Sequence, residues 1–180
     1  EKGDIGQNVS TASTKLVHGG LRYLDNYHFS IVKRSLRERE LVYSSAPHVI
    51  SPMKFVIPVS RYSKSPLSMR LGLWLHDFLG KSKFIPKSRK VKFSHKYKGP
   101  LRNRFKHGFL YHDCWVNDAR LILLNAIDAV SKGANLMLDT EFVGADLAED
   151  NIWTVTLRNE DDEEYQVKAR YVVNASGASI

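Results

Sequence analysis

The 180-residue sequence predicts a mixed α/β fold, in which helices and strands alternate along the chain. Apolar residues recur with helical spacing at 27–45 and 118–131. The last third changes to strand character, and its final predicted strand, 171–174, runs into a turn of small residues. A helix, a strand, a hairpin, another strand and a small-residue loop, in this order, are typical of part of an α/β layer.

The other elements follow from apolar periodicity and from the positions of Pro and Gly. In the helix at 27–45, Val32 and Leu36 belong to the predicted buried stripe, whereas Lys33, Arg37, Glu38 and Arg39 are predicted to face water. The remaining predictions are a helix at 13–24 capped by Ser10, Thr11 or Ser13, a strand at 49–59, a helix at 66–79 closed by Gly80, an irregular basic stretch, a strand at 109–116, a cap at Asn117 or Asp118, and strands at 135–143, 153–157 and 165–169.

Composition excludes several classes of protein. With 43% hydrophobic residues the chain can bury a core, so wholesale disorder is excluded. Its one cysteine, Cys114, excludes a disulfide framework and a multi-cysteine zinc site, and the histidines lack metal-ligand spacing, so no metal site is predicted. No apolar run is long enough for a transmembrane helix. The abrupt start at Glu1 indicates a piece of a longer protein.

Positive charge is concentrated in one part of the sequence. The net charge is +8, and between Phe78 and His112 there are eleven Lys and Arg but no Asp or Glu. Such a stretch could bind nucleic acid, anionic lipid or a phosphorylated substrate, or it could be a solvated face. Aromatic residues among the charges would suit stacking on single-stranded nucleic acid, but no known nucleic-acid-binding motif is present.

Residues 10–24 contain the densest group of candidate site residues. Hydroxyl side chains and free backbone N–H groups at a helix start would attract an anion such as a pyrophosphate. Gly19 and Gly20 would each cost a helix roughly 1 kcal/mol relative to Ala, so the pair suggests that a flat group approaches the backbone. Arg22 offers a planar fork for phosphate or carboxylate, with the Tyr23 hydroxyl beside it. An ordinary helix–loop junction with glycine packing explains the same residues.

A family resemblance favours the first interpretation. The string Ser13-Thr14-Lys15-Leu16-Val17-His18-Gly19-Gly20-Leu21-Arg22-Tyr23-Leu24 resembles the flavin-contacting segment of FAD-dependent glycerol-3-phosphate dehydrogenases of the aerobic, respiratory type. The similarity continues in family order through Asp113-Cys114-Trp115-Val116-Asn117-Asp118-Ala119-Arg120-Leu121 and Val173-Asn174-Ala175-Ser176-Gly177. Two specific strings in the family's order make a chance match very improbable.

The resemblance implies a fold and a domain division. The expected fold is part of a Rossmann-like FAD-binding domain of the D-amino-acid-oxidase and glutathione-reductase type, joined to part of an antiparallel-sheet substrate domain. Residues 1–45 and 117–180 would belong to the FAD-binding domain, and residues 46–116 to the substrate, or cap, domain. Family members carry a glycine-rich turn upstream and further substrate-site residues downstream. The isolated segment is therefore expected to bind FAD weakly and to be inactive.

The resemblance also implies an activity. Family members oxidise sn-glycerol 3-phosphate to dihydroxyacetone phosphate by passing a hydride from carbon 2 to N5 of FAD, with quinone as the electron acceptor. Such a protein would lie in the cytoplasm, peripherally on the inner face of the cytoplasmic membrane, where the basic stretch could meet anionic lipid. An oxygen-using oxidase of the same fold and a basic nucleic-acid-binding module are the alternatives, and the oligomeric state stays open.

Site residues carry over from the family motif position by position. Arg22 would bind the substrate phosphate, with Tyr23 beside the flavin ring, and His18 is a candidate for flavin contact or catalytic proton handling. Glu1 would bind the adenosine ribose, and Asp118 is expected to cap its helix. The full predicted cofactor-binding set is Glu1, Ser10, Thr11, Ser13, Thr14, Lys15, Leu16, His18, Gly19, Gly20, Phe142, Val143, Ala175, Ser176 and Gly177.

Overall fold

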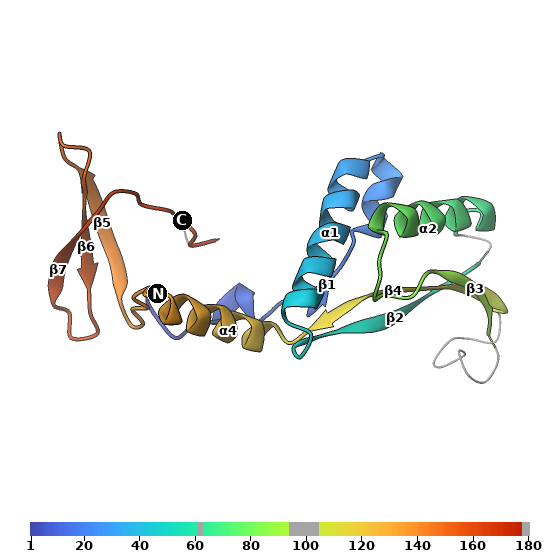
Figure 1. Cartoon of the computed structure of the whole chain (residues 1–180), viewed down its shortest axis with the longest axis horizontal. Coiled ribbons are helices and arrows are strands. Elements are labelled where there is room, and N and C mark those ends of the chain that lie inside the picture. The colour runs from blue at the N-terminus through green and yellow to red at the C-terminus, as the bar shows by residue number, and fades with distance from the viewer. Residues whose placement is uncertain (61–62, 94–104, 178–180) are drawn as a thin grey trace. The chain divides into compact units, whose positions relative to one another are not determined.

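The computed structural model describes residues 1–60, 63–93 and 105–177, so part of the predicted basic stretch, residues 94–104, lies outside the described residues (Figure 1). The chain forms two compact units, one of Ser13–Leu121 and one of Glu1–Ala12 with Ile122–Ile180. The predicted family-domain boundaries near residues 46 and 117 stay a prediction.

The unit Ser13–Leu121 is built on an antiparallel sheet around strand β4 (His107–Val116). Strand β2 (Ile50–Pro58) follows one edge of β4 from Ile50, opposite Val116, to Pro58, opposite Gly108. The short strands β1 (Leu16–Val17) and β3 (Arg89–Lys92) both pair with β4, β1 near its end and β3 near its beginning. β4 therefore joins segments that lie far apart in the sequence.

Two helices lie on the same face of this sheet, α1 (Phe29–Ser45) and α2 (Pro66–Gly80) (Figure 1). Helix α2 begins as its sequence predicts, with Pro66 in the first turn and the Ser65 side chain accepting a hydrogen bond from the Ser68 amide. It ends where Lys81 adopts a left-handed conformation. A third helix, α4 (Asp118–Ser131), follows β4 directly, and Asn117 Oδ1 caps it by accepting from the Arg120 amide.

The core of this unit consists of two apolar clusters. One lies where α1 meets the sheet and contains Ile50, Ile85, Cys114 and Val116. The other joins α1 to the chain that follows β1 and contains Leu24, Val32 and Leu36. Burial raises the pKa of the Cys114 thiol to about 11, so this thiol is protonated at neutral pH.

The second unit contains a three-stranded antiparallel meander of β5 (Glu141–Leu147), β6 (Trp153–Arg158) and β7 (Glu164–Ala169). The register of β5 against β6 shifts between Phe142 and Gly144, so the ladder passes over Val143. A short 3₁₀ helix, η1 (Asn8–Ser10), precedes the sheet in sequence. The Glu1 carbonyl accepts from the Thr140 amide, which ties the first residue to the chain before β5.

Most predicted elements are confirmed within a few residues: the helices at 27–45, 66–79 and 118–131, the strands at 49–59 and 109–116, and the hairpin at 153–169. The predicted helix at 13–24 is wrong. The chain there forms β1 and then a 3₁₀ helix, η2 (Leu21–Asn26). Positive φ angles of 56° at Lys15 and 68° at Gly20 are incompatible with a continuous right-handed helix.

Four further predictions are corrected. The strand expected at 135–143 begins later, at Glu141, and the basic stretch, predicted irregular, contains β3. Residues 171–174 form no strand in the described chain, because no neighbouring strand pairs with them there, and Tyr171 and Val173 are exposed. Arg39, predicted to face water, is buried.

No helix among the described residues is long and apolar enough to cross a membrane.

Candidate functional site

The predicted site segment forms a turn at the end of β1. Leu16 and Val17 pair with Trp115 and Cys114 of β4, which places His18-Gly19-Gly20 directly after the last paired residue. Gly20, with a φ of 68°, ends this turn and begins η2, which contains Arg22 and Tyr23. Since no helix begins at residues 10–13, the predicted anion site at a helix start there is wrong.

The two glycines have separate structural reasons. A Cβ on Gly19 would overlap Leu36 Cδ2 and lie 2.6 Å from His76 Nε2, so Gly19 packs directly against α1 and α2. Gly20 needs its left-handed backbone, and a Cβ there would lie 2.7 Å from the Tyr23 ring. Glycine packing against protein therefore accounts for Gly19. The approach of a flat group to the backbone stays a prediction.

The Asp118 carboxylate holds the beginning of the segment. Its Oδ2 accepts from the Ser13 hydroxyl at 2.7 Å, and its Oδ1 accepts from the Lys15 ammonium at 2.6 Å. The Lys15 ion pair, with the Ser13 hydrogen bond, lowers the pKa of Asp118 to about 2. Ser13 also accepts from the Lys15 amide at 2.9 Å. Ser13, one of the predicted helix caps, is therefore bound to Asp118 instead. Asp118, which was expected to cap α4, binds Ser13 and Lys15, while Asn117 caps that helix.

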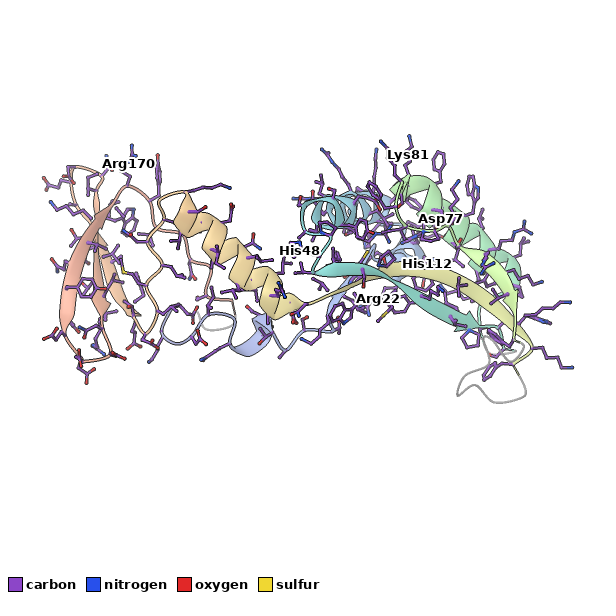
Figure 2. The ribbon with its side chains drawn as sticks, turned by 60° about the horizontal axis from the view of Figure 1, so that its bottom comes forward. Arg22, His48, Asp77, Lys81, His112 and Arg170 are labelled. Carbon is purple, nitrogen blue, oxygen red and sulfur yellow. The ribbon has the colours of Figure 1, made fainter. Side chains whose placement is uncertain are left out.

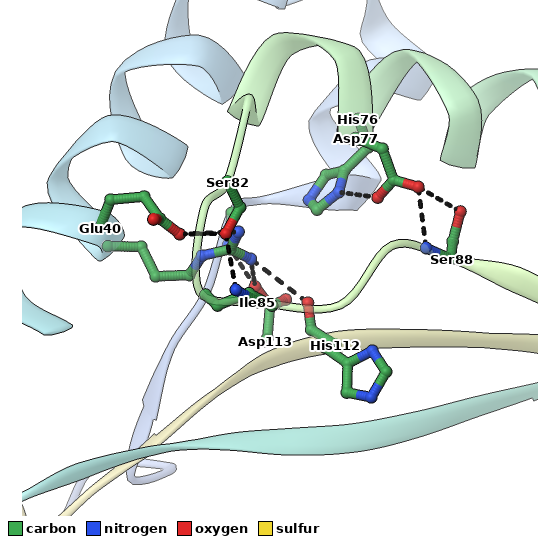
Figure 3. Close-up of polar contacts among 10 residues, drawn as sticks. Glu40, His76, Asp77, Ser82, Ile85, Ser88, His112 and Asp113 are labelled. Carbon is green, nitrogen blue, oxygen red and sulfur yellow. Dashed lines mark hydrogen bonds and ion pairs between the residues drawn. The ribbon is translucent and has the colours of Figure 1, made fainter. Parts of the chain in front are cut away.

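The Asp113 carboxylate holds the turn. Its Oδ1 accepts from the Gly19 amide at 2.9 Å and from Arg39 Nη1 at 2.6 Å. Arg39 comes from α1 and also donates to the His112 carbonyl at 3.3 Å (Figure 3). The Arg39 and Asp113 side chains are only 3% and 5% exposed. A buried pair of this kind links α1, β4 and the turn through charge-assisted hydrogen bonds.

A small polar cavity lies beside this ion pair. It is lined by Arg39, His76, Asp77, Ser82 and His112, among others, with about 20 Å³ open to the centre of a water molecule. Figure 2 shows Asp77 and His112 in the unit of α2 and β4, and Figure 3 shows the polar contacts around them. Among the described residues, three buried polar atoms have no hydrogen-bond partner, and all three belong to residues of this lining: Arg39 Nε, His76 Nε2 and His112 Nδ1.

The charge states around the cavity follow from its contacts. Burial, opposed by a hydrogen bond to the Pro86 backbone, lowers the pKa of His112, so this imidazole is neutral at pH 7. Burial alone would raise the pKa of Asp77, but hydrogen bonds from His76 and Ser88 outweigh it and lower that pKa. The Ser88 hydroxyl donates to Asp77 Oδ2 at 2.6 Å, so the 82–88 loop is fixed to the end of α2.

Of the predicted catalytic and substrate residues, His18 and Arg22 face outward from the turn, whereas Tyr23 is half-buried and packs against the cluster of Leu24, Val32 and Leu36. His18 and Arg22 are exposed, and the Arg22 guanidinium lies 5.8 Å from the Tyr23 ring centroid (Figure 2). Arg22 forms no ion pair within the part of the chain that the structure describes. His18 Nδ1 accepts from the Gly20 amide at 3.2 Å, so neutral His18 carries its proton on Nε2. In this geometry Nε2 can donate a hydrogen bond to a ligand.

The other predicted cofactor residues are less closely grouped. Thr14 is exposed and Leu16 lies in β1, both in the unit of the turn. The rest lie in the other unit: Glu1, Ser10, Thr11, Phe142, Val143, Ala175, Ser176 and Gly177. Asn174 Oδ1 accepts from the Ser176 amide at 3.1 Å and from its hydroxyl at 2.7 Å, which confirms a small-residue turn. Phe142 and Val143 lie at the register shift of β5, with exposed side chains.

Sequence reasoning missed the residues that hold the turn from behind. Arg39 lies three and seven residues after Leu36 and Val32, so the apolar stripe of α1 already placed it on the buried face. Asp113 lies between buried neighbours in β4, where a charged residue requires a partner. These two signals are visible in the sequence, whereas the contact of Asp113 with the Gly19 amide requires the fold.

Residues 1–180 match the family of FAD dependent oxidoreductases over the whole chain. The chain belongs to this family. In sequence it is 44% identical to the D-erythritol 1-phosphate dehydrogenase of Brucella abortus, 41% to a glycerol-3-phosphate dehydrogenase of Pseudomonas aeruginosa, and 39% to the aerobic glycerol-3-phosphate dehydrogenase of Escherichia coli K12. Each match covers 98% of this chain and 36%, 34% and 35% of the respective relative. The chain thus spans about a third of these relatives.

A solved structure shares the fold of this FAD dependent oxidoreductase chain. It is the glycerol-3-phosphate dehydrogenase of Bacillus halodurans complexed with FAD, which aligns with a TM-score of 0.62 at 26% identity, over 97% of this chain and 28% of that one. The family match and this likeness confirm the predicted resemblance and fold class. The residues of the turn also fit a flavin and a phosphate, because the imidazole of His18 and the guanidinium of Arg22 are exposed on its outward side while protein fills the inner side.

Proposed function

We propose that the intact protein containing this chain uses FAD to oxidise a polyol phosphate, sn-glycerol 3-phosphate, to dihydroxyacetone phosphate. The observation that carries the proposal is the match at 39–41% identity, over 98% of the chain, to proteins named glycerol-3-phosphate dehydrogenase. The exposed Arg22 on a turn held from behind supports it, because a guanidinium without a carboxylate partner among the described residues suits a phosphate.

Each residue of the turn has a proposed role. FAD, when bound, supplies the acceptor for a hydride from carbon 2 of the substrate. Arg22 binds the substrate phosphate through its planar fork, and Tyr23 keeps the guanidinium in place through their stacked contact. His18 donates a hydrogen bond from Nε2, since its Nδ1 is occupied by the Gly20 amide. Thr14 and the residues of the other unit's small-residue turn contact the cofactor away from the reacting atoms.

A four-carbon substrate is the second candidate. The relative at 44% identity is named D-erythritol 1-phosphate dehydrogenase, and it matches the same 98% of the chain. Both substrates are polyol phosphates, so Arg22 would bind either phosphate. The two differ by one hydroxylated carbon, which is a small difference for a binding pocket to discriminate. Comparing kcat/KM for glycerol 3-phosphate and for D-erythritol 1-phosphate distinguishes the two assignments.

The substrate proposal is tested by replacing Arg22 in the intact protein. We expect Arg22→Gln to raise KM for glycerol 3-phosphate about 10- to 100-fold, because a charge-assisted hydrogen bond to phosphate contributes about 1.5–3 kcal/mol. Arg34→Gln, on the exposed side of α1, is the matched control and should leave KM unchanged. An intact protein that binds no FAD, or that oxidises neither polyol phosphate, would contradict the proposed function.

We propose quinone as the electron acceptor, following the resemblance to respiratory dehydrogenases. The alternative is an oxidase that uses oxygen. Steady-state assays with glycerol 3-phosphate separate the two. Quinone reduction without oxygen consumption supports the dehydrogenase, whereas hydrogen peroxide formation at a comparable rate supports the oxidase.

We also propose that the protein lies in the cytoplasm, bound peripherally to the anionic inner face of the cytoplasmic membrane. Helix α2 supports this proposal, because one of its faces exposes Leu67, Leu71, Trp74 and Phe78. The Trp74 and Phe78 rings stack with centroids 5.6 Å apart, and Lys81 follows at the helix end. Exposed aromatic residues with flanking cations are typical of helices that lie in a membrane interface.

Vesicle binding tests this attachment. The intact protein should bind vesicles rich in phosphatidylglycerol and not neutral phosphatidylcholine vesicles. Trp74→Ser/Phe78→Ser should weaken this binding severalfold, and Leu41→Ser, an exposed apolar position on α1, is the matched control. Equal binding by all variants would contradict a role for α2. Tighter binding to a single-stranded oligonucleotide than to vesicles would instead support the nucleic-acid alternative.

A further inference from the structure

One carboxylate oxygen of Asp113 joins three elements at the back of the turn. Asp113 Oδ1 accepts both from the Gly19 amide and from Arg39 Nη1, at 2.9 and 2.6 Å. Gly19 belongs to the turn, Asp113 to β4 and Arg39 to α1. Both charged side chains are almost completely buried. Neither reaches the outward side of the turn, where His18 and Arg22 are exposed.

We propose that Asp113, oriented by Arg39, is a positioning residue that fixes the His18-Gly19-Gly20 turn before substrate and cofactor bind. The inference rests on the proposed function, because it concerns the site that contains His18 and Arg22. The Gly19 amide belongs to the peptide group between His18 and Gly19, so its direction sets the orientation of the backbone that enters Gly19, directly before Gly20. The left-handed φ of 68° at Gly20 then determines the direction in which η2 starts, and with it the position of Arg22.

The opposite side of Gly19 is fixed by packing. Because a Cβ on Gly19 would overlap Leu36 Cδ2 and lie 2.6 Å from His76 Nε2, the turn cannot move towards α1 or α2. The hydrogen bond to Asp113 prevents the reverse movement. A site residue held in this way loses little conformational freedom when a ligand binds, which is the physical basis of preorganisation.

Arg39 gives this hydrogen bond its strength and direction. The guanidinium holds Asp113 Oδ1 through a charge-assisted hydrogen bond at 2.6 Å, and its second hydrogen bond, to the His112 carbonyl at 3.3 Å, fixes the guanidinium relative to β4. A purely structural ion pair would require the Arg39–Asp113 contact and would not require the Gly19 contact. That difference can be measured.

A pair of double variants in the intact protein separates the two roles. Arg39→Met/Asp113→Asn removes both charges but leaves a side-chain oxygen to accept from the Gly19 amide. Arg39→Met/Asp113→Leu removes both charges and that acceptor. We expect amide exchange of Gly19, followed by NMR on ¹⁵N-glycine-labelled protein, to be at least tenfold faster in the Leu variant than in the Asn variant. We also expect KM for glycerol 3-phosphate to be at least tenfold higher, with a smaller difference in kcat.

Equal Gly19 exchange and equal KM in the two double variants would overturn the proposal and leave the ion pair a purely structural one. If the Leu variant does not fold, Arg39→Lys gives the second test, because it keeps the positive charge and removes the fork. A rise in KM of severalfold at a melting temperature within a few degrees of the parent supports positioning, and an unchanged KM overturns it. If the parent protein lacks FAD or activity, the proposed function fails, but the difference in exchange still tests the positioning of the turn.

Discussion

At the scale of single residues, two carboxylates from one short stretch determine the conformation of the predicted site segment. Asp118 holds Ser13 and Lys15, and Asp113 holds Gly19, so both ends of the segment are fixed from the β4 side. Between them, β1 adds only two residue pairs. Side-chain acceptors therefore supply much of the order that a longer strand would provide through its ladder.

The Asp118 contacts predict a pH dependence. The pKa of Asp118 falls from its ordinary value of 3.8 to about 2 on folding, so its ion pair stabilises the folded state above pH 4 and is lost as the pH falls towards 2. Asp118→Asn should lower the melting temperature at pH 7, and the difference from the parent should shrink between about pH 4 and 2. Asp128→Asn, which breaks an exposed pair with Lys132, is the control and should change little.

The packing of Gly19 predicts a strong effect of one methyl group. Gly19→Ala should destabilise the fold by about 1–3 kcal/mol, because the new Cβ meets Leu36 and His76 in a filled space. Chemical denaturation measures this loss. Gly144→Ala is the matched control, since a Cβ there meets nothing within 4 Å. A loss at Gly19 no larger than that at Gly144 would contradict the packing argument.

The cavity beside Arg39 predicts a bound water. Arg39 Nε can only donate, whereas His76 Nε2 and His112 Nδ1 accept if their other nitrogens face Asp77 and Pro86. One water accepts from the first and donates to the other two, and about 20 Å³ is enough for it. A crystal structure near 1.5 Å resolution should show one ordered water there. An empty cavity, or a chloride ion in place of the water, would contradict this assignment.

Residue roles could be predicted from the sequence only in part. A helix cap at Asn117 or Asp118 follows from local pattern, and the structure assigns it to Asn117. Arg39 was predicted to face water because a charged residue usually does, although its spacing from Val32 and Leu36 indicates the buried face. The partner that makes its burial favourable, Asp113, lies 74 residues away, and local periodicity carries no information at that distance.

At the scale of elements, long helices were predicted well and short segments were not. α1, α2 and α4 have apolar periodicity over 14–17 residues with recognisable ends, so local preference and packing agree. The segment 13–24 has leucines at helical spacing, yet it forms β1 and η2. Two of its residues adopt positive φ, and pairing with β4 outweighs a helix preference of a few tenths of a kcal/mol per residue.

Two substitutions at helix α2 should change the stability of the fold in opposite directions. Gly72 lies in its interior with nothing within 4 Å of an added Cβ, so Gly72→Ala should stabilise the fold by about 0.5–1 kcal/mol. Ser65→Ala removes the cap on the Ser68 amide and should destabilise it by about 1 kcal/mol. Urea titrations of both variants measure the two changes. Effects of the same sign would contradict the assigned helix bounds.

At the scale of the whole molecule, charge is divided between the two units. The unit Ser13–Leu121 contains 22 Lys and Arg against 6 Asp and Glu, a net charge of +16, whereas the other unit contains 5 against 13, a net charge of −8. The total of +8 therefore conceals two regions of opposite sign. The basic stretch between Phe78 and His112 is visible in the sequence, but the contrast in charge between the two units becomes clear only once the fold defines them.

This division predicts how vesicle binding responds to salt. If the basic unit meets the anionic surface, raising NaCl from about 0.05 to 0.5 M should weaken binding at least tenfold, because the screening length falls to a few ångströms. Trp74→Ser/Phe78→Ser should be more sensitive to salt than the parent, since only the charge attraction remains. Cosedimentation at several salt concentrations measures both effects. Binding unaffected by salt would exclude electrostatic attachment.

The register of strand β4 limits where insertions and deletions can occur in the chain. Leu110 pairs with Arg89 of β3, and Cys114 pairs with Val17 just before the turn, so three residues of β4 separate the basic strand from the candidate site. One residue inserted between Leu110 and Asp113 would add about 3.3 Å to that interval and turn the following side chains to the opposite face. Asp113 would then point away from Arg39 and Gly19. Homologous proteins that keep this site should therefore keep Asp113 and the length of this interval, while the residues around Asp113 can vary.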